Sequence, residues 1–309
     1  QRQMCIRDRS KANVIPECAI QREQTMKQIL GIVASQRQLG NCEIMVKEVS
    51  RQLPVPHHLQ LLRLPDFNVR YCNGCYRCLS KGACVLADDL LTILAAIAAA
   101  DALILAAPTY FLGGHACLKA FVDRGISFYA MADRLWGKPA VGIGVAGIEG
   151  KEGSTLLDIE RFLLTIQASN QMSRIVYAAL PGEVVMSEGN KRIAGELARA
   201  LFGEAMLRPQ PCCPLCGGDT VRFLENGQVR CMLCSNTGEL VDGPDGLTLK
   251  ISKDDHAFVA DQNAALQHRD WLQGMLARYR EQKHALKEIQ AVYKDESPWI
   301  KPSGPLVNS

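Results

Sequence analysis

Short apolar runs alternate with segments of helical spacing through roughly the first two hundred residues of the chain. We expect strands at Gln28–Ala34, Leu59–Leu64, Ala102–Ala107, Pro139–Val145 and Arg174–Leu180. We expect helices at Cys42–Leu53, Thr155–Ala168 and Lys191–Phe202. Two more are expected, one that follows a cap at Asp88 or Asp89 and one that begins near Cys117. Strand–helix units in this order imply an α/β fold, a doubly wound parallel sheet with helices on both faces.

The central unit, Ala102–Arg124, indicates a ligand site. Its apolar run stops at Pro108, and an aromatic pair and two glycines follow before the helical spacing begins. In open α/β sheets, ligands bind in the crevice beyond the carboxyl ends of the strands. We therefore expect the segment Pro108–Phe111 to line a ligand.

The loop after the first strand has the residues of an anion site. Ser35 offers a hydroxyl, Arg37 a guanidinium and Asn41 an amide, beside the positive end of a helix dipole. No lysine followed by serine or threonine marks a triphosphate loop, so a monophosphate fits better. Ordinary helix capping is the alternative for these residues. The glycine pattern Gly142–Gly147 lies inside the fourth strand without the acidic residue of a dinucleotide site, and we interpret it as a chance match.

The chain contains 13 cysteines, of which eight form two tight groups. In a cytosolic chain such groups serve metal or redox chemistry rather than disulfides. The first group comprises Cys72, Cys75, Cys78 and Cys84. Two consecutive two-residue gaps are typical of [4Fe–4S] ligation, whereas zinc sites usually use two separated pairs. Reduced thiols retained for packing are the alternative.

The second cysteine group consists of two separated pairs. They are Cys213 with Cys216 and Cys231 with Cys234, fourteen residues apart. Four cysteines at this spacing predict a structural zinc ribbon, closed and tetrahedral. Rubredoxin-type iron uses the same ligands, but the separation is short for it. Charge between the pairs is balanced, so we expect the ribbon to stabilise the tail and dock the final helix rather than bind nucleic acid.

Together these motifs resemble the NADPH-dependent FMN reductase group of flavodoxin-like proteins, in particular the iron–sulfur flavoproteins. The matching pieces are Ser35-x-Arg37-x-x-x-Asn41, the cysteine run ending at Gly82-Ala-Cys84 with Asp88-Asp89 behind it, Ala107–Phe111, and Lys119-x-Phe121-x-Asp123-Arg124. The resemblance covers residues 27–203. It implies a five-stranded sheet of order 2-1-3-4-5, with FMN at the switch point between the first and third strands.

The resemblance also implies which residues meet the flavin. The phosphate would be surrounded by Ser35, Arg37, Gly40, Asn41 and Cys42. One edge of the ring would be surrounded by Pro108, Thr109, Tyr110 and Phe111, and the other edge by Gly147, Ile148 and Gly150. Cys42 stands where the family usually has a hydroxyl and Gln36 where proline is common, so weakened FMN binding is expected. We expect His115 to cap its helix or lie on the surface, and Asp123 and Arg124 to form a structural salt bridge at a subunit contact.

Four parts are expected along the chain. Residues 1–25 form a disordered or non-native extension, 26–208 the FMN-binding domain, 209–250 the zinc-ribbon module and 251–309 a helical tail. The tail helix, from about Val259 to Tyr293, carries an apolar stripe that we expect to pack on another copy in a dimer or tetramer. Net charge is only +3, and no segment suits a membrane span or a signal peptide. These features predict a cytoplasmic protein that binds neither nucleic acid nor membrane.

The expected function is electron transfer at FMN, with the chemistry supplied by the cofactor and no catalytic side chain assigned. NAD(P)H or a ferredoxin-like protein would be the donor. A quinone, a free flavin or, through the cluster, a protein partner would be the acceptor. Two other functions fit the sequence. A non-enzymatic electron carrier would lack steady-state turnover with NAD(P)H, and a zinc-ribbon interaction or regulatory protein on a flavodoxin-like scaffold would be colourless.

Overall fold

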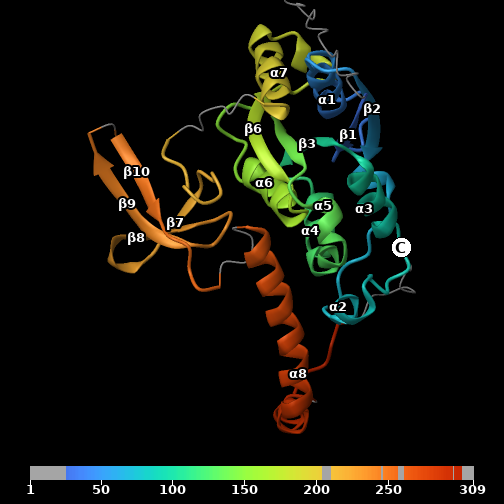
Figure 1. Ribbon diagram of the computed structural model, residues 1–309, viewed down its shortest axis with the longest axis vertical. Helices are drawn as coiled ribbons and strands as arrows, with labels where there is room; N and C mark the ends of the chain where they lie inside the picture. The colour runs from blue at the N-terminus through green and yellow to red at the C-terminus, as the bar shows by residue number, and fades with distance from the viewer. Residues whose placement is uncertain (1–25, 204–209, 245, 257–260, 295, 301–309) are drawn as a thin grey trace, which may run out of the picture.

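The computed structural model describes residues 26–203, 210–244, 246–256, 261–294 and 296–300. Figure 1 shows an α/β domain, a small antiparallel sheet beside it and a long helix below both. The extension predicted at 1–25 and the start of the predicted linker at Pro209 lie outside the described residues.

A parallel sheet forms the centre of the α/β domain. Its strands are β1 Lys27–Val33, β2 His57–Arg63, β3 Ala102–Tyr110, β5 Pro139–Ala146 and β6 Ser169–Tyr177. They run in the order β2-β1-β3-β5-β6, and the two-residue β4, Gly113–Gly114, pairs only with β3. The predicted order is thereby confirmed. β6 begins before its predicted start at Arg174, because an edge strand accepts polar residues that give no apolar signal.

Helices cover both faces of this sheet. On one face lie α1 Asn41–Arg51 and α7 Glu188–Leu201, and on the other α3 Leu90–Ala99, α4 Ala116–Val122 and α6 Thr155–Thr165. Successive residues of β3 alternate between the two cores: Leu103 and Leu105 pack with α3 and α6, whereas Ile104 packs with α1 and α7. Shorter helical segments are η1 Leu64–Asp66, α2 Arg77–Lys81, η2 Gly125–Met131, α5 Ala132–Leu135, η3 Glu183–Val185 and η4 Glu225–Gly227.

The second sheet is antiparallel and has its own small core. Its strands are β7 Val221–Phe223, β8 Gln228–Cys231, β9 Thr237–Gly243 and β10 Gly246–Ile251, in the order β10-β9-β8-β7. The core includes Val229, Leu233 and Leu249, and it extends onto α6 through Leu157. The second sheet therefore packs directly on the α/β domain.

The long helix α8, Gln262–Val292, is anchored only near its start. The Asp261 carboxylate caps it by accepting from the Ala264 N–H at 2.8 Å, and Ala264, Ala265 and Leu272 are buried. Farther along, Tyr279, Ile289 and Tyr293 are exposed, so packing of this stripe on another copy stays a prediction. None of the described helices combines the length and apolar character needed to span a membrane.

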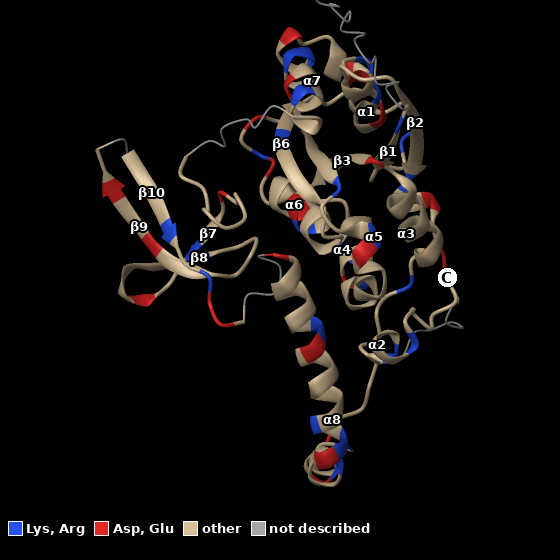
Figure 2. Cartoon of the chain, in the orientation of Figure 1, with Lys and Arg blue, Asp and Glu red and all other residues tan. Residues whose placement is uncertain are grey.

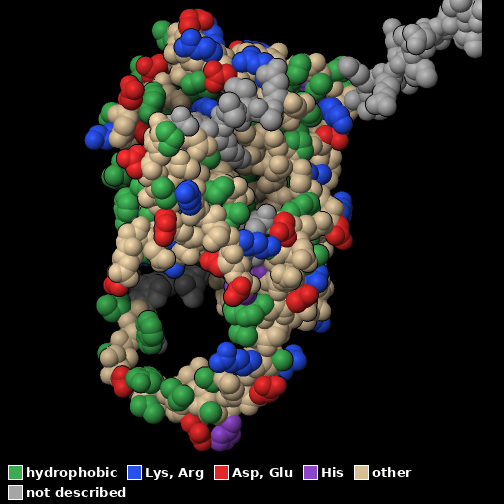
Figure 3. Space-filling view, turned by 60° about the vertical axis from the view of Figure 1, so that its left-hand side comes forward, with side chains coloured by type: hydrophobic (Ala, Val, Ile, Leu, Met, Phe, Trp, Pro, Cys, Tyr) green, Lys and Arg blue, Asp and Glu red, His purple; other side chains and the backbone are tan. Residues whose placement is uncertain are grey.

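Charges of both signs are distributed over the molecule. Lysine, arginine, aspartate and glutamate alternate along α8 (Figure 2), and acidic and basic side chains are interspersed over the face drawn in Figure 3.

Candidate functional site

Three loops lie at the carboxyl edge of the parallel sheet. β1, β3 and β5 are neighbours and run parallel, so the segments that follow them emerge at the same edge. These segments are the phosphate loop, residues 34–40, the β3–β4 hairpin, residues 108–115, and the glycine loop, residues 147–154. The positions predicted to meet a flavin all lie in these loops or in the first residues of α1.

Arg63, the last residue of β2, holds the phosphate loop in shape. Its Nη1 donates to the carbonyl oxygens of Ser35 and Arg37, both at 2.9 Å, and its Nη2 donates to Glu43 Oε2 at 2.7 Å. Sequence reasoning missed this residue. The signal that could have identified it is its place at the end of the second strand. Arg63 pairs with Val33, so β2 ends level with the end of β1 and beside the phosphate loop.

Glu43 completes this clamp from α1. It is 6% exposed and also accepts hydrogen bonds from Lys47 Nζ at 2.6 Å and from the Leu39 N–H at 2.9 Å. Burial alone would raise the pKa of Glu43, but hydrogen bonds from Lys47, Arg63 and the Leu39 N–H outweigh it and lower the pKa to about 2. Two cations thus neutralise this carboxylate, and it does not repel an anion from the loop.

Of the residues predicted to bind phosphate, some have side chains that are exposed and others have side chains that already contact the protein. Ser35 is buried and its hydroxyl accepts from the Arg37 N–H at 3.3 Å, while the Arg37 side chain is exposed and forms no ion pair with any described residue. Gly40 precedes α1 and provides no side-chain cap. The first N–H groups of α1 must then be satisfied from outside the helix, by water or by an anion.

Asn41 has a different role from a simple phosphate donor. Its Nδ2 donates to the carbonyl oxygens of Ala178 and Leu180 at 3.3 and 3.0 Å. Its Oδ1 accepts from the N–H groups of Gly182 and Val184 at 2.9 and 3.4 Å. Both amide hydrogens are used within the protein, so an anion at this helix end would meet the backbone of Asn41.

Cys42, in the first turn of α1, is 3% exposed and packs in the core beneath the helix. Burial, reinforced by the nearby Cys117, raises the pKa of the Cys42 thiol to about 12. The group stays protonated at neutral pH and offers at most a weak S–H donor.

The β3–β4 hairpin turns through two bulky residues in an unusual conformation. Tyr110 pairs with Gly113, and the intervening Phe111 and Leu112 have φ angles of 47° and 66°. This is the geometry of a type I′ turn, which normally selects Asn-Gly. Left-handed conformations cost about 1–2 kcal/mol for each residue with a Cβ. Such strain is concentrated at functional sites.

The glycine loop is fastened to the turn of this hairpin. The Leu112 carbonyl oxygen accepts from the Ser154 N–H at 2.7 Å, and the Gly114 N–H donates to Asp158 Oδ2 at 3.0 Å. A Cβ at Gly153 would lie 2.1 Å from the Leu112 oxygen, so only glycine fits there. Ser154 and Asp158, which sequence reasoning missed, therefore make the two loops one wall.

Large apolar side chains are exposed along this edge. Phe111 is fully exposed, and Leu39, Tyr110, Leu112, Ile148 and Leu180 are each about half exposed or more. Exposed apolar groups gathered on loops at a strand edge are typical of a site for a flat apolar ligand. His115 caps α4 as predicted, with Nδ1 accepting from the Cys117 N–H at 3.2 Å, and its ring lies 5.4 Å from that of Tyr110.

We expect the double substitution Phe111→Asn with Leu112→Gly to stabilise the protein while weakening flavin binding. The new residues suit the left-handed turn, so relief of strain should raise the free energy of unfolding by about 1–2 kcal/mol. Two exposed apolar side chains beside the expected position of the flavin ring would be lost. Chemical denaturation of the apoprotein and FMN titration measure the two effects. A fall in both stability and affinity would contradict a strained turn retained for binding.

The first cysteine group lines one small cavity. All four cysteines border it, together with Arg124, Ile126 and Ser127 from the segment after α4. Around a single zinc ion, sulfur atoms lie about 3.8 Å apart. Among the described residues, only the second cysteine group has four sulfurs this close together. The four sulfurs of the first group are thus not gathered for a single ion, and the [4Fe–4S] cluster stays a prediction.

Arg124 joins this cysteine loop to the core. It is 2% exposed and forms an ion pair with Asp88, whose side chain is equally buried. It also donates to Cys84 Sγ at 2.9 Å and to the Arg70 carbonyl oxygen at 2.7 Å. The predicted structural salt bridges are present, but for Arg124 the predicted place at a subunit contact was wrong. Arg124 pairs inside its own chain, because its side chain points inward, and the adjacent Asp123 pairs with Lys119.

The second cysteine group has the geometry of a closed tetrahedral metal site. Its four sulfurs lie within 4.8 Å of one another, with Cys213–Cys234 and Cys216–Cys231 separations of 3.8 and 3.5 Å. A tetrahedral zinc with Zn–S bonds of about 2.3 Å requires about 3.8 Å. The Asn236 amide, 1% exposed, donates to Cys234 Sγ at 3.3 Å and orients this ligand. The residues fit a metal ion, and zinc remains the predicted one.

Comparison with known proteins agrees with this geometry. Residues 27–178 match the family described as NADPH-dependent FMN reductase. An iron–sulfur flavoprotein of Methanocaldococcus jannaschii is 31% identical over 140 residues, 44% of this chain and 71% of that protein. One from Archaeoglobus fulgidus is 28% identical over 183 residues, 58% of this chain and 83% of that protein.

Among solved structures, a flavone reductase has a TM-score of 0.66 at 16% sequence identity. The match covers 89% of this chain and 100% of that one. At this level of identity the likeness concerns the fold alone. The shared fold nevertheless extends beyond the parallel sheet.

Proposed function

Because this chain belongs to the family of NADPH-dependent FMN reductases and iron–sulfur flavoproteins, we propose that it binds FMN at the carboxyl edge of its parallel sheet. It is a flavin-dependent oxidoreductase. NAD(P)H or a ferredoxin-like protein donates the electrons. The acceptor is a quinone, a free flavin or a redox protein reached through the first cysteine group.

The exposed apolar wall formed by the β3–β4 hairpin and the glycine loop carries this proposal. Apolar side chains are normally more stable when buried, yet Phe111 and Ile148 are held at the surface. They lie beside the N-terminus of α1, which has no side-chain cap. An apolar wall and an anion site at one sheet edge match a planar ring joined to a phosphate. The isoalloxazine ring lies against the wall, and the phosphate meets Arg37, Ser35 and the first turn of α1.

Each part of the chain has a distinct task toward the flavin. Bound FMN accepts a hydride and releases electrons singly or in pairs, so it links nicotinamide donors to one-electron acceptors. Arg63 and Glu43 keep the phosphate loop open, and Ser154 and Asp158 hold the hairpin against the glycine loop. Pro108 and Thr109 line the ring edge, with Thr109 fixed to Thr155 through a 2.8 Å hydroxyl contact.

The two cysteine groups have separate roles. Cys72, Cys75, Cys78 and Cys84 hold a [4Fe–4S] cluster, with the Arg124 guanidinium donating to the Cys84 sulfur. Such a hydrogen bond stabilises negative charge on the ligands and favours the reduced cluster. Cys213, Cys216, Cys231 and Cys234 bind zinc, which stabilises the second sheet.

Absorption spectra of anaerobically purified protein, with iron and zinc analysis, test this function. Flavin bands that bleach with NADPH are expected, with four irons and one zinc per chain as in the proposed sites. Absence of flavin would refute the proposal. Flavin with zinc but no iron would remove only the cluster.

Arg37→Ala tests where the phosphate lies. Loss of a charge-assisted hydrogen bond, about 1.5–3 kcal/mol, should weaken FMN affinity by roughly 10- to 100-fold without changing protein stability. Arg51→Ala is the matched control, since Arg51 lies at the other end of α1 and its side chain is 76% exposed. FMN titration by fluorescence quenching measures both variants. Equal affinities would place the phosphate elsewhere.

A further inference from the structure

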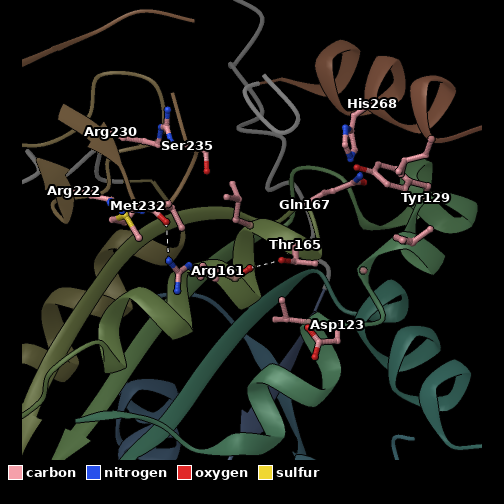
Figure 4. A pocket seen from close by; sticks show the side chains of 16 residues that line it. Asp123, Tyr129, Arg161, Thr165, Gln167, Arg222, Arg230, Met232, Ser235 and His268 are labelled. Atoms are coloured by element: carbon pink, nitrogen blue, oxygen red, sulfur yellow. Dashed lines mark hydrogen bonds between the residues drawn. The ribbon is translucent and has the colours of Figure 1, made fainter. Parts of the chain in front are cut away.

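A cavity of about 550 Å³ lies where the α/β domain, the second sheet and α8 meet. Arg161 and Thr165 of α6 form its base, Arg222 and Arg230 approach from the second sheet, and His268 approaches from α8 (Figure 4). The volume is in the range of small-ligand sites, roughly 300–1,000 Å³. It shares no residue with the phosphate loop, the β3–β4 hairpin or the glycine loop.

Two arginines that are directly opposite each other on neighbouring strands line one side of this cavity. Arg222 of β7 pairs with Arg230 of β8, which places both side chains on the same face of the second sheet. Like charges in this arrangement repel and destabilise the strand pair. Neither guanidinium forms an ion pair or hydrogen bond with another described residue. An anion bound between them would remove the repulsion and use the planar donor groups of both.

Gln167 contributes an unusual polar group to the wall of this cavity. Its side chain is buried, with 6% of the residue exposed, and it lines the same cavity. Its Oε1 is the one buried side-chain oxygen or nitrogen of the described residues that has no hydrogen-bond partner. Buried acceptors are nearly always satisfied, so this oxygen costs stability, and it is itself closed to solvent and to the cavity.

Aromatic rings line the side of the cavity opposite the arginines. Tyr129 and His268 lie there (Figure 4), with ring centroids 6.1 Å apart, and the His268 ring stacks on Trp271 at 5.6 Å. Such faces bind planar rings. Ile126 lines both this cavity and the cavity of the first cysteine group, so a ligand here would be close to that group.

We propose that this cavity binds a phosphorylated planar molecule of nucleotide size. The phosphate lies between Arg222 and Arg230, because two guanidinium groups match the two negative charges of a phosphate better than the single charge of a carboxylate. The ring lies against Tyr129 and His268. The ligand connects the second sheet to the α/β domain, and this binding is separate from the flavin site.

Calorimetric titration of the zinc-loaded and FMN-saturated chain with adenosine monophosphate tests the proposal. Saturable binding of one molecule per chain is expected, at least about 10-fold tighter than that of adenosine or inorganic phosphate, because each lacks one half of the contacts. Equal affinity for phosphate alone would reduce the site to an ion site and overturn the proposal. Absence of saturable binding would overturn it as well.

Two variants separate binding from folding. Arg222→Glu should abolish adenosine monophosphate binding and raise the thermal stability of the second sheet, since the introduced carboxylate would pair with Arg230 across the strands. Gln167→Leu should bind adenosine monophosphate normally without loss of stability, because it removes an unsatisfied acceptor that the ligand does not reach. Arg278→Ala, at an exposed position of α8 outside the cavity, is the control and should bind normally. Normal binding by Arg222→Glu, with zinc retained, would refute the assignment.

Discussion

Replacing Arg124 with glutamine is expected to lower the free energy of unfolding by about 3–5 kcal/mol. The change leaves the Asp88 carboxylate buried without its cation and removes the donors to Cys84 and Arg70. It should also lower the iron content of the anaerobically purified protein, because the cysteine loop would lose its link to the core. Denaturant unfolding and iron analysis measure the two effects.

Lys119→Ala is a matched control on the same segment of chain. Lys119 and Asp123 also form an ion pair, but their side chains are 75% and 42% exposed. Exposed pairs contribute about 0–1 kcal/mol, so this variant should unfold nearly as the parent does and keep its iron. Similar losses in both variants would mean that burial of the Arg124–Asp88 pair has no special effect.

The effect of Arg124→Gln should depend on pH. Burial alone would raise the pKa of Asp88, but hydrogen bonds from Arg124 and from the backbone of Arg70 and Leu90 lower it. In the parent, this group stabilises the fold above the ordinary aspartate pKa of about 4 and loses the effect as pH falls below it. In the variant, the unpaired carboxyl prefers its proton, so acidification should reduce the stability difference. A difference that is constant between neutral pH and about pH 4 would contradict this account.

Replacing Cys231 with serine is expected to unfold the second sheet and leave the α/β domain folded. Structural zinc supplies about 10–16 kcal/mol of binding free energy at neutral pH, and the small core of this sheet has little to replace it. The parallel sheet has two larger cores of its own and should retain FMN. Zinc analysis, limited proteolysis and flavin absorption distinguish the two parts.

Cys212→Ser is the control for this experiment. Cys212 is adjacent to Cys213 but lies outside the four-sulfur group, so its substitution should leave zinc content and proteolytic resistance unchanged. A Cys231→Ser variant that keeps both its zinc and its resistance would rule out the predicted ligand set.

Local patterns predicted most of the elements. The alternation of apolar and helical segments located the five long parallel strands, and the cysteine spacing identified the four sulfurs that converge in the second sheet. Both signals are short-range, so a single sequence carries them. The turn at Phe111 and Leu112 was not predictable in this way, because neither residue favours a left-handed conformation.

Partners far apart in sequence were the main omission. Arg63 was a plain strand residue until the pairing of β1 with β2 placed it beside the phosphate loop. Arg124 was assigned to a subunit contact, because its partner Asp88 is separated from it in sequence by α3, β3 and α4. Asn41 was assigned to phosphate, and only the approach of residues 178–184 shows that its amide is used within the protein.

By itself, the sequence determined the α/β class, the order of the elements and the two cysteine groups, since periodicity and ligand spacing act over a few residues. The tertiary structure alone decided which charges are buried, which loops are joined and where a cavity forms. Arg222 and Arg230 illustrate the difference, because only strand pairing places the two guanidinium groups side by side. Long-range contacts depend on how the whole chain packs, and that packing determines which polar groups remain for a ligand.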